Sequence, residues 1–338
     1  MKISAKKRLQ FKNSFDGSII FGTRKFNQVT GRNRLEDPVS ERFTEFFINP
    51  DTGLLKSEMC KYRKCPVCDS DKTNLVFVKG GFRHVQCKCG FIYVNPTAKD
   101  KNREEFFRDI YHSWTDVLLT DEQKEIDKRK FEYGLAVIET YCKKKGLLVD
   151  IGAGTGQFLE IAICRGWNVI AVEFNKKAIE QIRSKGIKVV NKPLEQNIIK
   201  RHSANVVTLW EVLEHINDVN AFLMNVYKIM KTGALLYICV PNIDALVTRI
   251  MHEKSGTFAG YSHVNFFNIN TIGQLCKKHG FQILETDSFI SEIGTIKNYL
   301  CYQDPYNGNA DLSLDFLTPE YLYKNNLGSR ITMLCRKK

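Results

Sequence analysis

Five of the eleven cysteines fall between Cys60 and Cys89, and four of them form two close pairs. The first pair is Cys65 and Cys68, in a Cys-x-x-Cys turn, and the second is Cys87 and Cys89. Each pair offers two sulfurs to one ion, and two pairs about twenty residues apart suit a tetrahedral Zn²⁺ site. Because four thiolates leave no open coordination position, the sequence predicts a structural zinc site.

Other interpretations of these cysteines stay open at this point. The second pair is Cys-x-Cys, so Cys60 is an alternative ligand. The thiols could also be reduced and buried without a metal, or Cys65 and Cys68 could form a redox pair. Apolar stretches around Gly80-Gly81 predict a hairpin of strands over 74–79 and 82–86 that brings the two pairs together.

A glycine-rich loop, Asp150–Gly156, follows the apolar stretch 147–151. Glycines let the backbone turn sharply and approach a ligand closely. The pattern is Gly-x-Gly-x-Gly, which differs from the Gly-x-Gly-x-x-Gly of dinucleotide-binding folds. The acid Glu173 ends the next predicted strand, 21 residues after Gly152, where it can accept hydrogen bonds from ribose hydroxyls. The loop and this acid together predict a site for a nucleoside-containing cofactor.

Two histidines follow later strands and are candidate bases. His215 follows the predicted strand 206–210, and His263 follows the predicted strand 234–240 in a loop with Tyr261. Each of the three could instead have only a structural role. We expect Glu214 to orient its neighbours or cap backbone donors, and Glu211 could line the cofactor site.

Strands and helices must alternate to position these residues, and the pattern from Gly146 onward shows this alternation. It predicts an α/β fold with a doubly wound, mostly parallel seven-stranded sheet, whose strands bind ligands at their carboxyl ends. Apolar stripes predict helices over 98–145, with Tyr111 and Trp114 as a possible roof of the substrate pocket. The expected organisation is a basic extension (1–59), a small cysteine-bearing β module (60–97), a helical cap (98–145) and the α/β body (146–338), with an insert over 290–328.

The composition is that of a folded globular protein with a basic balance. Hydrophobic residues make up 43% and charged residues 26%, while 50 Lys and Arg against 37 Asp and Glu give a net charge of +13. About half of this excess lies before residue 65, in a segment that either wraps or frays at the surface or serves as an acceptor-binding or anion-binding arm. We expect no membrane span or signal peptide, and reduced thiols in the cytoplasm.

Five segments at the ends of the predicted strands match the motifs of a known protein family. Through these segments, residues 147–285 resemble class I S-adenosylmethionine-dependent methyltransferases, with a last strand at 330–336. Two of the segments are similar to those of a bacterial small-molecule subgroup related to quinone O-methyltransferases, and residues 65–96 resemble zinc modules that precede sugar-modifying and other biosynthetic methyltransferases. The sequence departs from the family at Asn205, where an Asp often opens the fourth strand. The matching segments are Asp150–Gly156, Glu173, Leu209–His215, Pro241-Asn242 and Tyr261–Phe267.

The resemblance implies roles for single residues. The glycine loop would face the amino-acid tail and ribose of S-adenosylmethionine, with Asp150 supporting the loop or holding the ammonium group, and Glu173 would bind the ribose diol. Leu194 and Trp210 would flank the adenine, whose acidic partner is unclear, with Leu194 and Glu195 the nearest candidates. The implied cofactor-binding residues are Asp150, Gly152, Ala153, Gly154, Gly156, Glu173, Leu194 and Trp210.

The expected activity is methylation of a small polar metabolite, such as a nucleotide-linked sugar, with His263, His215 and Tyr261 as catalytic candidates. A zinc-containing RNA methyltransferase is the alternative, because the chain is basic. A third hypothesis is a non-catalytic scaffold that only binds the donor.

Overall fold

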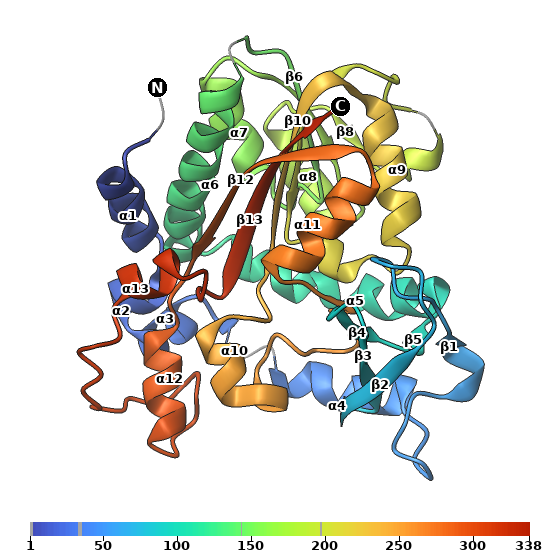
Figure 1. Ribbon diagram of the computed structural model, residues 1–338, viewed down its shortest axis with the longest axis vertical. Coiled ribbons are helices and arrows are strands. Elements are labelled where there is room, and N and C mark those ends of the chain that lie inside the picture. The colour runs from blue at the N-terminus through green and yellow to red at the C-terminus, as the bar shows by residue number, and fades with distance from the viewer. Residues whose placement is uncertain (1–2, 33–35, 143, 197) are drawn as a thin grey trace.

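The computed structural model describes residues 3–32, 36–142, 144–196 and 198–338, and its centre is a seven-stranded sheet (Figure 1). The strand order is β12-β13-β10-β9-β6-β7-β8. Strands β10, β9, β6, β7 and β8 run parallel, and β13 is antiparallel to both of its neighbours. The predicted doubly wound, mostly parallel seven-stranded sheet is confirmed. The strands are β6 (Leu147–Ile151), β7 (Asn168–Val172), β8 (Val189–Val190), β9 (Ala204–Trp210), β10 (Met230–Pro241), β12 (Phe281–Phe289) and β13 (Arg330–Lys337).

Helices cover both faces of this sheet. Alternate side chains of a strand point to opposite faces, and in β6 Leu148 packs with one buried cluster while Val149 packs with the other. Helices α6, α7 and α8 supply the first cluster, whereas α9 and α11 supply the second. These helices are α6 (Asp121–Tyr141), α7 (Gln157–Cys164), α8 (Lys176–Ser184), α9 (Val219–Ile229) and α11 (Ile269–Lys278).

The cysteine-bearing segment forms a second, four-stranded sheet of order β11-β4-β3-β2. Its edge strand β11 comes from the body of the protein, and Asn265 pairs with Tyr93 of β4. The short strands β1 and β5 pair with each other and close the segment at its two ends. The module is thus built into the body. Its strands are β1 (Cys60–Lys61), β2 (Thr73–Lys79), β3 (Phe82–Cys87), β4 (Ile92–Val94), β5 (Thr97–Ala98) and β11 (Asn265–Phe266).

The basic N-terminal segment packs into the protein where it is described, so it wraps and does not fray. In α1 (Ala5–Ser14), Arg8 and Lys12 pair with Glu285 and Asp287 of β12, and α1 lies beside α6 (Figure 1). Phe47 is fully buried in a second contact region, with the cysteine module and α5. The helices concerned are α2 (Gly17–Phe21), α3 (Thr23–Val29), α4 (Glu36–Phe47) and α5 (Asp100–Leu118).

The insert expected over 290–328 carries two helices and covers one end of the sheet. Ile296, Leu322 and Tyr323 are buried in the same cluster as α6 and α7. Among the described residues, no helix combines the length and apolar character that crossing a membrane requires. The remaining helices are α10 (Leu246–Met251), α12 (Ile293–Leu300) and α13 (Pro319–Lys324), with 3₁₀ turns η2 (Ser57–Met59), η3 (Leu194–Gln196), η4 (Leu213–His215) and η5 (His252–Lys254).

Candidate active site and metal centre

The segments singled out in the sequence meet at one edge of the large sheet. The parallel strands β6, β7, β9 and β10 end at this edge, and β13, which runs the other way, begins there with Arg330. The chain order reverses between β6 and β9, so their carboxyl ends flank a topological switch point. The glycine loop follows β6, and the segment that leads to His215 follows β9.

The glycine loop has a backbone that only glycine adopts easily. Gly152, Gly154 and Gly156 have φ values of +74°, +54° and +78°. At Gly152 a Cβ atom would also lie 2.7 Å from Cγ2 of Val212, which excludes any side chain there. Glycine is therefore required both for the turn and for the close approach of the segment after β9.

Glu173 lies directly beside this loop. Its Oε2 accepts a hydrogen bond of 2.8 Å from the Gly154 N–H, and its Oε1 accepts bonds from the N–H groups of Phe174 and Asn175 at 2.7 and 2.9 Å. Burial raises the pKa of Glu173, while these backbone donors lower it in part. The structure thus brings together the loop and the acid that the sequence paired.

Asp150 supports the loop from inside the sheet. It is 1% exposed, and its Oδ1 accepts a bond of 2.6 Å from the Thr208 hydroxyl on β9. Burial raises the pKa of Asp150 to about 8. Its position favours the supporting role over contact with a ligand's ammonium group. Ala153 is buried next to it in the loop.

The structure places Leu194 and Trp210 on different faces of the sheet. Leu194, in η3, packs against the cluster of α9 and α11, whereas Trp210 belongs to the cluster of α6 and α7. Trp210 packs edge-on against Phe131 at 5.0 Å between ring centroids, and its buried indole N–H has no hydrogen-bond partner. No side-chain description covers Glu195, Tyr111 or Trp114, so the roles expected for them lie outside the described residues.

His215 and His263 come together although 47 residues lie between them in the chain. Their ring centroids lie 5.0 Å apart at an angle of 62°. The Nδ1 atom of His215 lies 2.9 Å from the Ser262 carbonyl, and that of His263 lies 2.9 Å from the Thr257 carbonyl. Burial is the largest cause that lowers the pKa of His215 to about 3 and that of His263 to about 4. Both rings are therefore neutral at neutral pH.

Arg103, which sequence reasoning missed, holds the two histidine-bearing segments together. Its guanidinium donates to the carbonyls of His215 at 2.7 Å, Ser262 at 3.0 Å and Tyr261 at 3.3 Å. The Tyr261 ring lies 4.6 Å from the Phe43 ring, between centroids. The third catalytic candidate thus stands at the junction of the histidine loop with the N-terminal segment.

Two further links connect this loop to the cysteine module. Asn265 donates to the carbonyls of Leu213 at 2.8 Å and Ile216 at 2.7 Å. Arg63 donates to Asn265 Oδ1 at 2.8 Å and contacts the Val264 carbonyl as well. The histidine loop is therefore fixed from the side of the module.

The ion pair between Arg330 and Glu211 at the same edge of the sheet was also not predicted from the sequence. Arg330 donates through Nε to Oε1 of Glu211 at 3.0 Å, and Lys130 pairs with Asp127 at 2.6 Å. Desolvation alone would raise the pKa of Glu211, but the charges of Arg330 and Lys130 lower it to about 2. Glu211 also has φ +55°, an uncommon conformation for a non-glycine residue. The sequence predicts a last strand that starts at Arg330, but the antiparallel direction of this strand is a finding of the structure.

The four predicted cysteine ligands form one cluster. All four Sγ atoms lie within 4.8 Å of one another, with 3.6 Å between Cys65 and Cys89 and 3.4 Å between Cys68 and Cys87. Zn–S bonds of about 2.3 Å in a tetrahedron require sulfurs about 3.8 Å apart. The donor set and spacing thus fit a tetrahedral four-thiolate metal site. Cys60 is not part of the cluster, and its thiol faces the Lys56 carbonyl.

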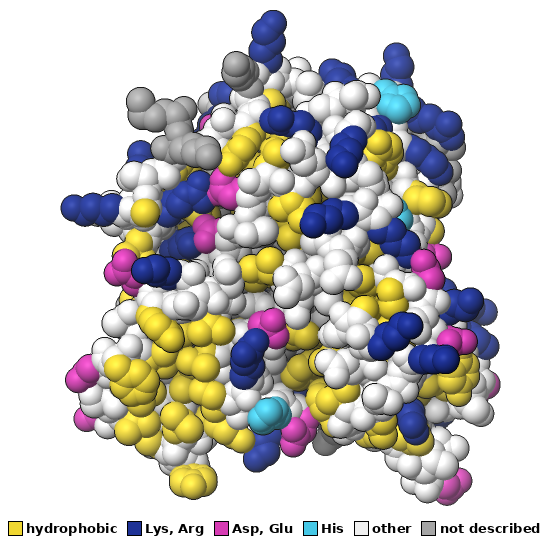
Figure 2. Space-filling view, viewed as in Figure 1, with side chains coloured by type: hydrophobic (Ala, Val, Ile, Leu, Met, Phe, Trp, Pro, Cys, Tyr) yellow, Lys and Arg dark blue, Asp and Glu magenta, His cyan; other side chains and the backbone are white. Residues whose placement is uncertain are grey.

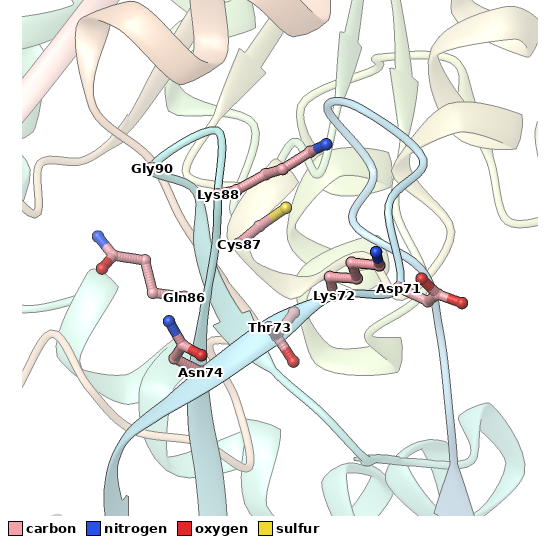
Figure 3. A pocket seen from close by; sticks show the side chains of 8 residues that line it. All are labelled: Asp71, Lys72, Thr73, Asn74, Gln86, Cys87, Lys88 and Gly90. Atoms are coloured by element: carbon pink, nitrogen blue, oxygen red, sulfur yellow. The ribbon is translucent and has the colours of Figure 1, made fainter.

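A shallow polar hollow lies on the outer side of this cluster (Figure 3). Figure 3 shows the Cys87 side chain directed from the hairpin toward the loop that precedes β2. The hollow is open to solvent. Its lining residues are Asp71, Lys72, Thr73, Asn74, Gln86, Cys87, Lys88 and Gly90.

Comparison with protein families gives a match over the middle of the chain. Residues 123–286, a little under half of the chain, match a family model described as a methyltransferase domain. This range contains the glycine loop, Glu173, His215 and His263.

Curated relatives match over a similar region. A ubiquinone biosynthesis O-methyltransferase of Pelagibacter ubique is 29% identical over 101 residues, which are 28% of this chain and 42% of that protein. A protein of Mycobacterium tuberculosis, described as a probable S-adenosylmethionine-dependent methyltransferase, is 26% identical over 103 residues, 30% of this chain and 37% of that protein. The chain thus spans only about two fifths of the length of these relatives.

Solved structures are similar at lower identity. A methyltransferase from Archaeoglobus fulgidus is 18% identical, with a TM-score of 0.47, 68% of this chain covered and 100% of that chain. A 1,6-didemethyltoxoflavin-N1-methyltransferase from Burkholderia thailandensis is 14% identical, with a TM-score of 0.47, 79% of this chain covered and 99% of that chain.

Proposed function

We propose that the chain transfers the methyl group of S-adenosylmethionine to a small polar metabolite, since residues 123–286 match the model of a methyltransferase domain. The observation that carries this proposal is the meeting of two features at one sheet edge. The glycine loop with Glu173 could hold the donor, and the paired histidines lie on the segments that follow the neighbouring strands β9 and β10.

The residues of the loop suit the donor chemically. Three glycines without side chains let the loop backbone approach a ligand closely, and the Glu173 carboxylate accepts hydrogen bonds of the kind that ribose hydroxyls donate. We assign the donor site to Asp150–Gly156 and Glu173, with Leu194 and Trp210 at its borders. The donor supplies an activated methyl group on a sulfonium, so the chain's main task is to align donor and acceptor.

His263 and His215 are the groups that we assign to the acceptor's proton, with Tyr261 as a third candidate. Both imidazoles have Nδ1 occupied by a carbonyl, which leaves the Nε2 lone pair available. When the acceptor oxygen or nitrogen attacks, it loses its proton, the methyl carbon–sulfur bond breaks, and the sulfur leaves as a neutral thioether.

The cysteine cluster is the proposed site of a structural Zn²⁺. Four thiolates would saturate the ion, so the cluster would stabilise the hairpin and take no part in transfer. It would thereby brace β11 and the histidine loop, which pair with the module. All eleven cysteines are free thiols, which favours a reducing compartment such as the cytoplasm.

The surface supports a small acceptor over RNA. On the face that Figure 2 shows, Lys and Arg side chains are scattered singly and do not form a continuous basic stripe. The N-terminal segment, where the basic excess is concentrated, uses Arg8 and Lys12 for internal ion pairs. A sugar linked to a nucleotide is one acceptor of the proposed class, and RNA is the alternative.

A labelling experiment tests the proposal. The purified chain would be incubated with methyl-labelled S-adenosylmethionine and either a small-metabolite pool or total RNA from the same cells. We expect label in the metabolite fraction, lost in His263→Gln and kept in the control His279→Gln, at the residue that follows the C-terminus of α11. Label in RNA alone would establish the alternative, and donor binding without transfer to either pool would favour a scaffold.

A further inference from the structure

Glu214 is a buried carboxyl group at the candidate active site. The residue is 1% exposed, and among the described residues neither Oε1 nor Oε2 has a hydrogen-bond partner. An unpaired buried carboxyl group is costly, because it loses its hydration without replacement. Such a group in a rigid site indicates a missing ligand.

Both histidines lie next to this carboxyl group. His215 Nε2 is 4.0 Å from Glu214 Oε1, and one ligand atom from each of Glu214, His215 and His263 lies within 4.8 Å of the other two. A carbonyl oxygen accepts and cannot donate, so each Nδ1 near a carbonyl must carry the ring's proton. Both Nε2 atoms are therefore left as unprotonated lone pairs.

We propose that Glu214, His215 and His263 form a second metal site, which binds one divalent transition-metal ion at the end of β9. Two imidazole nitrogens and one carboxylate oxygen are a ligand set of Zn²⁺, Fe²⁺, Mn²⁺ and Co²⁺. Three protein ligands leave further positions open, in contrast to the four-cysteine cluster.

The surroundings of the three residues are those of a prepared site. Metal-bound histidines usually donate their second N–H to a carbonyl or carboxylate, which fixes the ring, and both rings here do so. Arg103 clamps the carbonyls of His215 and Ser262, and the Val264 N–H donates to the Glu214 carbonyl at 2.7 Å. The backbone of all three ligands is therefore held.

Bonds of about 2.1 Å to nitrogen and oxygen place neighbouring ligand atoms roughly 3 to 3.5 Å apart. The separation of 4.0 Å between His215 Nε2 and Glu214 Oε1 is somewhat wider, so these side chains must close slightly on the ion. Glu211 is not available as a further ligand in this arrangement, because it is paired with Arg330.

This inference rests on the proposed function, and it makes the two histidines metal ligands in place of bases. A neutral imidazole is a weak base for an acceptor hydroxyl, whose own pKa is far higher. An ion held by these three residues would bind that hydroxyl at one of its open coordination positions and lower the pKa of the hydroxyl. The proton would then leave to water before the oxygen attacks the methyl group. The histidines would then assist proton loss as ligands.

Cobalt binding tests the site without any need for the acceptor. Full-length protein with its zinc in place would be dialysed against Co²⁺, and both metals would be quantified per chain. We expect one Co²⁺ bound with zinc retained, and at least a 100-fold weaker affinity in Glu214→Gln and in His263→Ala. The control His279→Ala changes a histidine that bonds Asn220 outside the site and should bind Co²⁺ as the unchanged protein does.

Three results would overturn the proposal. The first is that Co²⁺ binds only by displacing zinc from the cysteines. The second is that Glu214→Gln and His263→Ala leave Co²⁺ binding unaffected. The third is that Co²⁺ is lost only when Cys68→Ser is introduced. Glu214→Gln is nearly isosteric and removes an unpaired carboxylate, so we expect it to fold, and circular dichroism checks this. Calorimetry with S-adenosylmethionine tests the donor site separately, because donor binding should persist in Glu214→Gln.

Discussion

The carboxylate of Glu173 accepts a hydrogen bond from the backbone N–H of Gly154 at 2.8 Å, which ties the end of β7 to the glycine loop after β6. Its other oxygen holds the N–H groups of Phe174 and Asn175 at the start of α8. One carboxylate thus fixes the geometry of two loops at the switch point. It has acceptor capacity left for hydroxyl donors, because a carboxylate offers about four lone-pair sites.

Glu173→Gln should weaken donor binding. The amide replaces one acceptor oxygen by an NH₂ group, which faces backbone N–H donors and cannot accept from ribose. We expect the Kd for S-adenosylmethionine to rise at least tenfold in calorimetry, a loss of about 1.4 kcal/mol. Glu180→Gln, on the exposed side of α8, is the matched control. An unchanged Kd in Glu173→Gln would remove Glu173 from the donor site.

Gly152→Ala should reduce donor binding more than its backbone strain explains. The new Cβ would lie 2.7 Å from Val212, in addition to the strain at φ +74°. Gly186→Ala has a similar φ of +69° with no atom near the new Cβ, so it carries the strain alone, about 1 kcal/mol. We expect donor affinity to fall at least tenfold in Gly152→Ala only. Equal affinity in the two variants would show that the loop does not contact the donor.

The fold and the ligand clusters were predictable because their signals are local. Strand and helix periods mark the elements between Leu147 and Lys337, and the apolar stretch 147–151 has the bounds observed for β6. The cysteine pairs and the glycine loop are short motifs whose chemistry depends on neighbours in the chain. The parallel sheet then brings the strand ends to one edge.

The remaining parts depend on partners far apart in the sequence. Arg103 clamps carbonyls of residues more than a hundred positions away, and Arg63 reaches Asn265. The N-terminal segment reads as polar and basic, yet Arg8 and Lys12 are neutralised by acids of β12. The sequence pattern within 1–59 does not indicate the partners of this segment, because each contact is made with an element elsewhere in the chain.

Phe47→Ala tests whether the N-terminal segment belongs to the core. Phe47 is fully buried, and its ring lies 4.9 Å from Phe106 and 6.2 Å from Phe82, between centroids. Removing a buried phenyl ring typically costs 3–5 kcal/mol, so the urea midpoint should fall accordingly. Phe316→Ala, at a residue that is 79% exposed, should change the free energy of unfolding by no more than about 0.5 kcal/mol. A small loss in Phe47→Ala would mean that 1–59 is dispensable.

Cys87→Ser should release one equivalent of zinc per chain. Cys87 is buried, and its sulfur lies 3.4 Å from that of Cys68, so the substitution removes one of four ligands. Elemental analysis should show the loss, and the unfolding temperature should fall because zinc binding contributes to folding. The exposed Cys164→Ser provides the control. If Cys87→Ser retained as much zinc as the control, the cluster would not be the zinc site.

Asp150→Asn should stabilise the protein in a way that depends on pH. The folded pKa of Asp150 is raised by burial to about 8, whereas in the unfolded chain it stays near 3.8. The folded state therefore holds the proton more tightly, and the stability that the neutral acid provides is lost as the pH rises from about 4 toward 8. Asparagine is neutral at every pH and can still accept the Thr208 hydroxyl through its amide oxygen.

The difference in unfolding free energy between Asp150→Asn and the unchanged protein should thus grow between pH 5 and pH 8, by at most about 1.4 kcal/mol per pH unit. Urea titrations of both proteins at each pH, without donor, measure it, and taking the difference cancels titrations common to both. A difference that stays constant over this range would mean that Asp150 is ionised in the folded protein at every pH tested. The ionised form would then have to be stabilised by groups other than Thr208, because that hydroxyl is its only hydrogen-bond partner in the described structure.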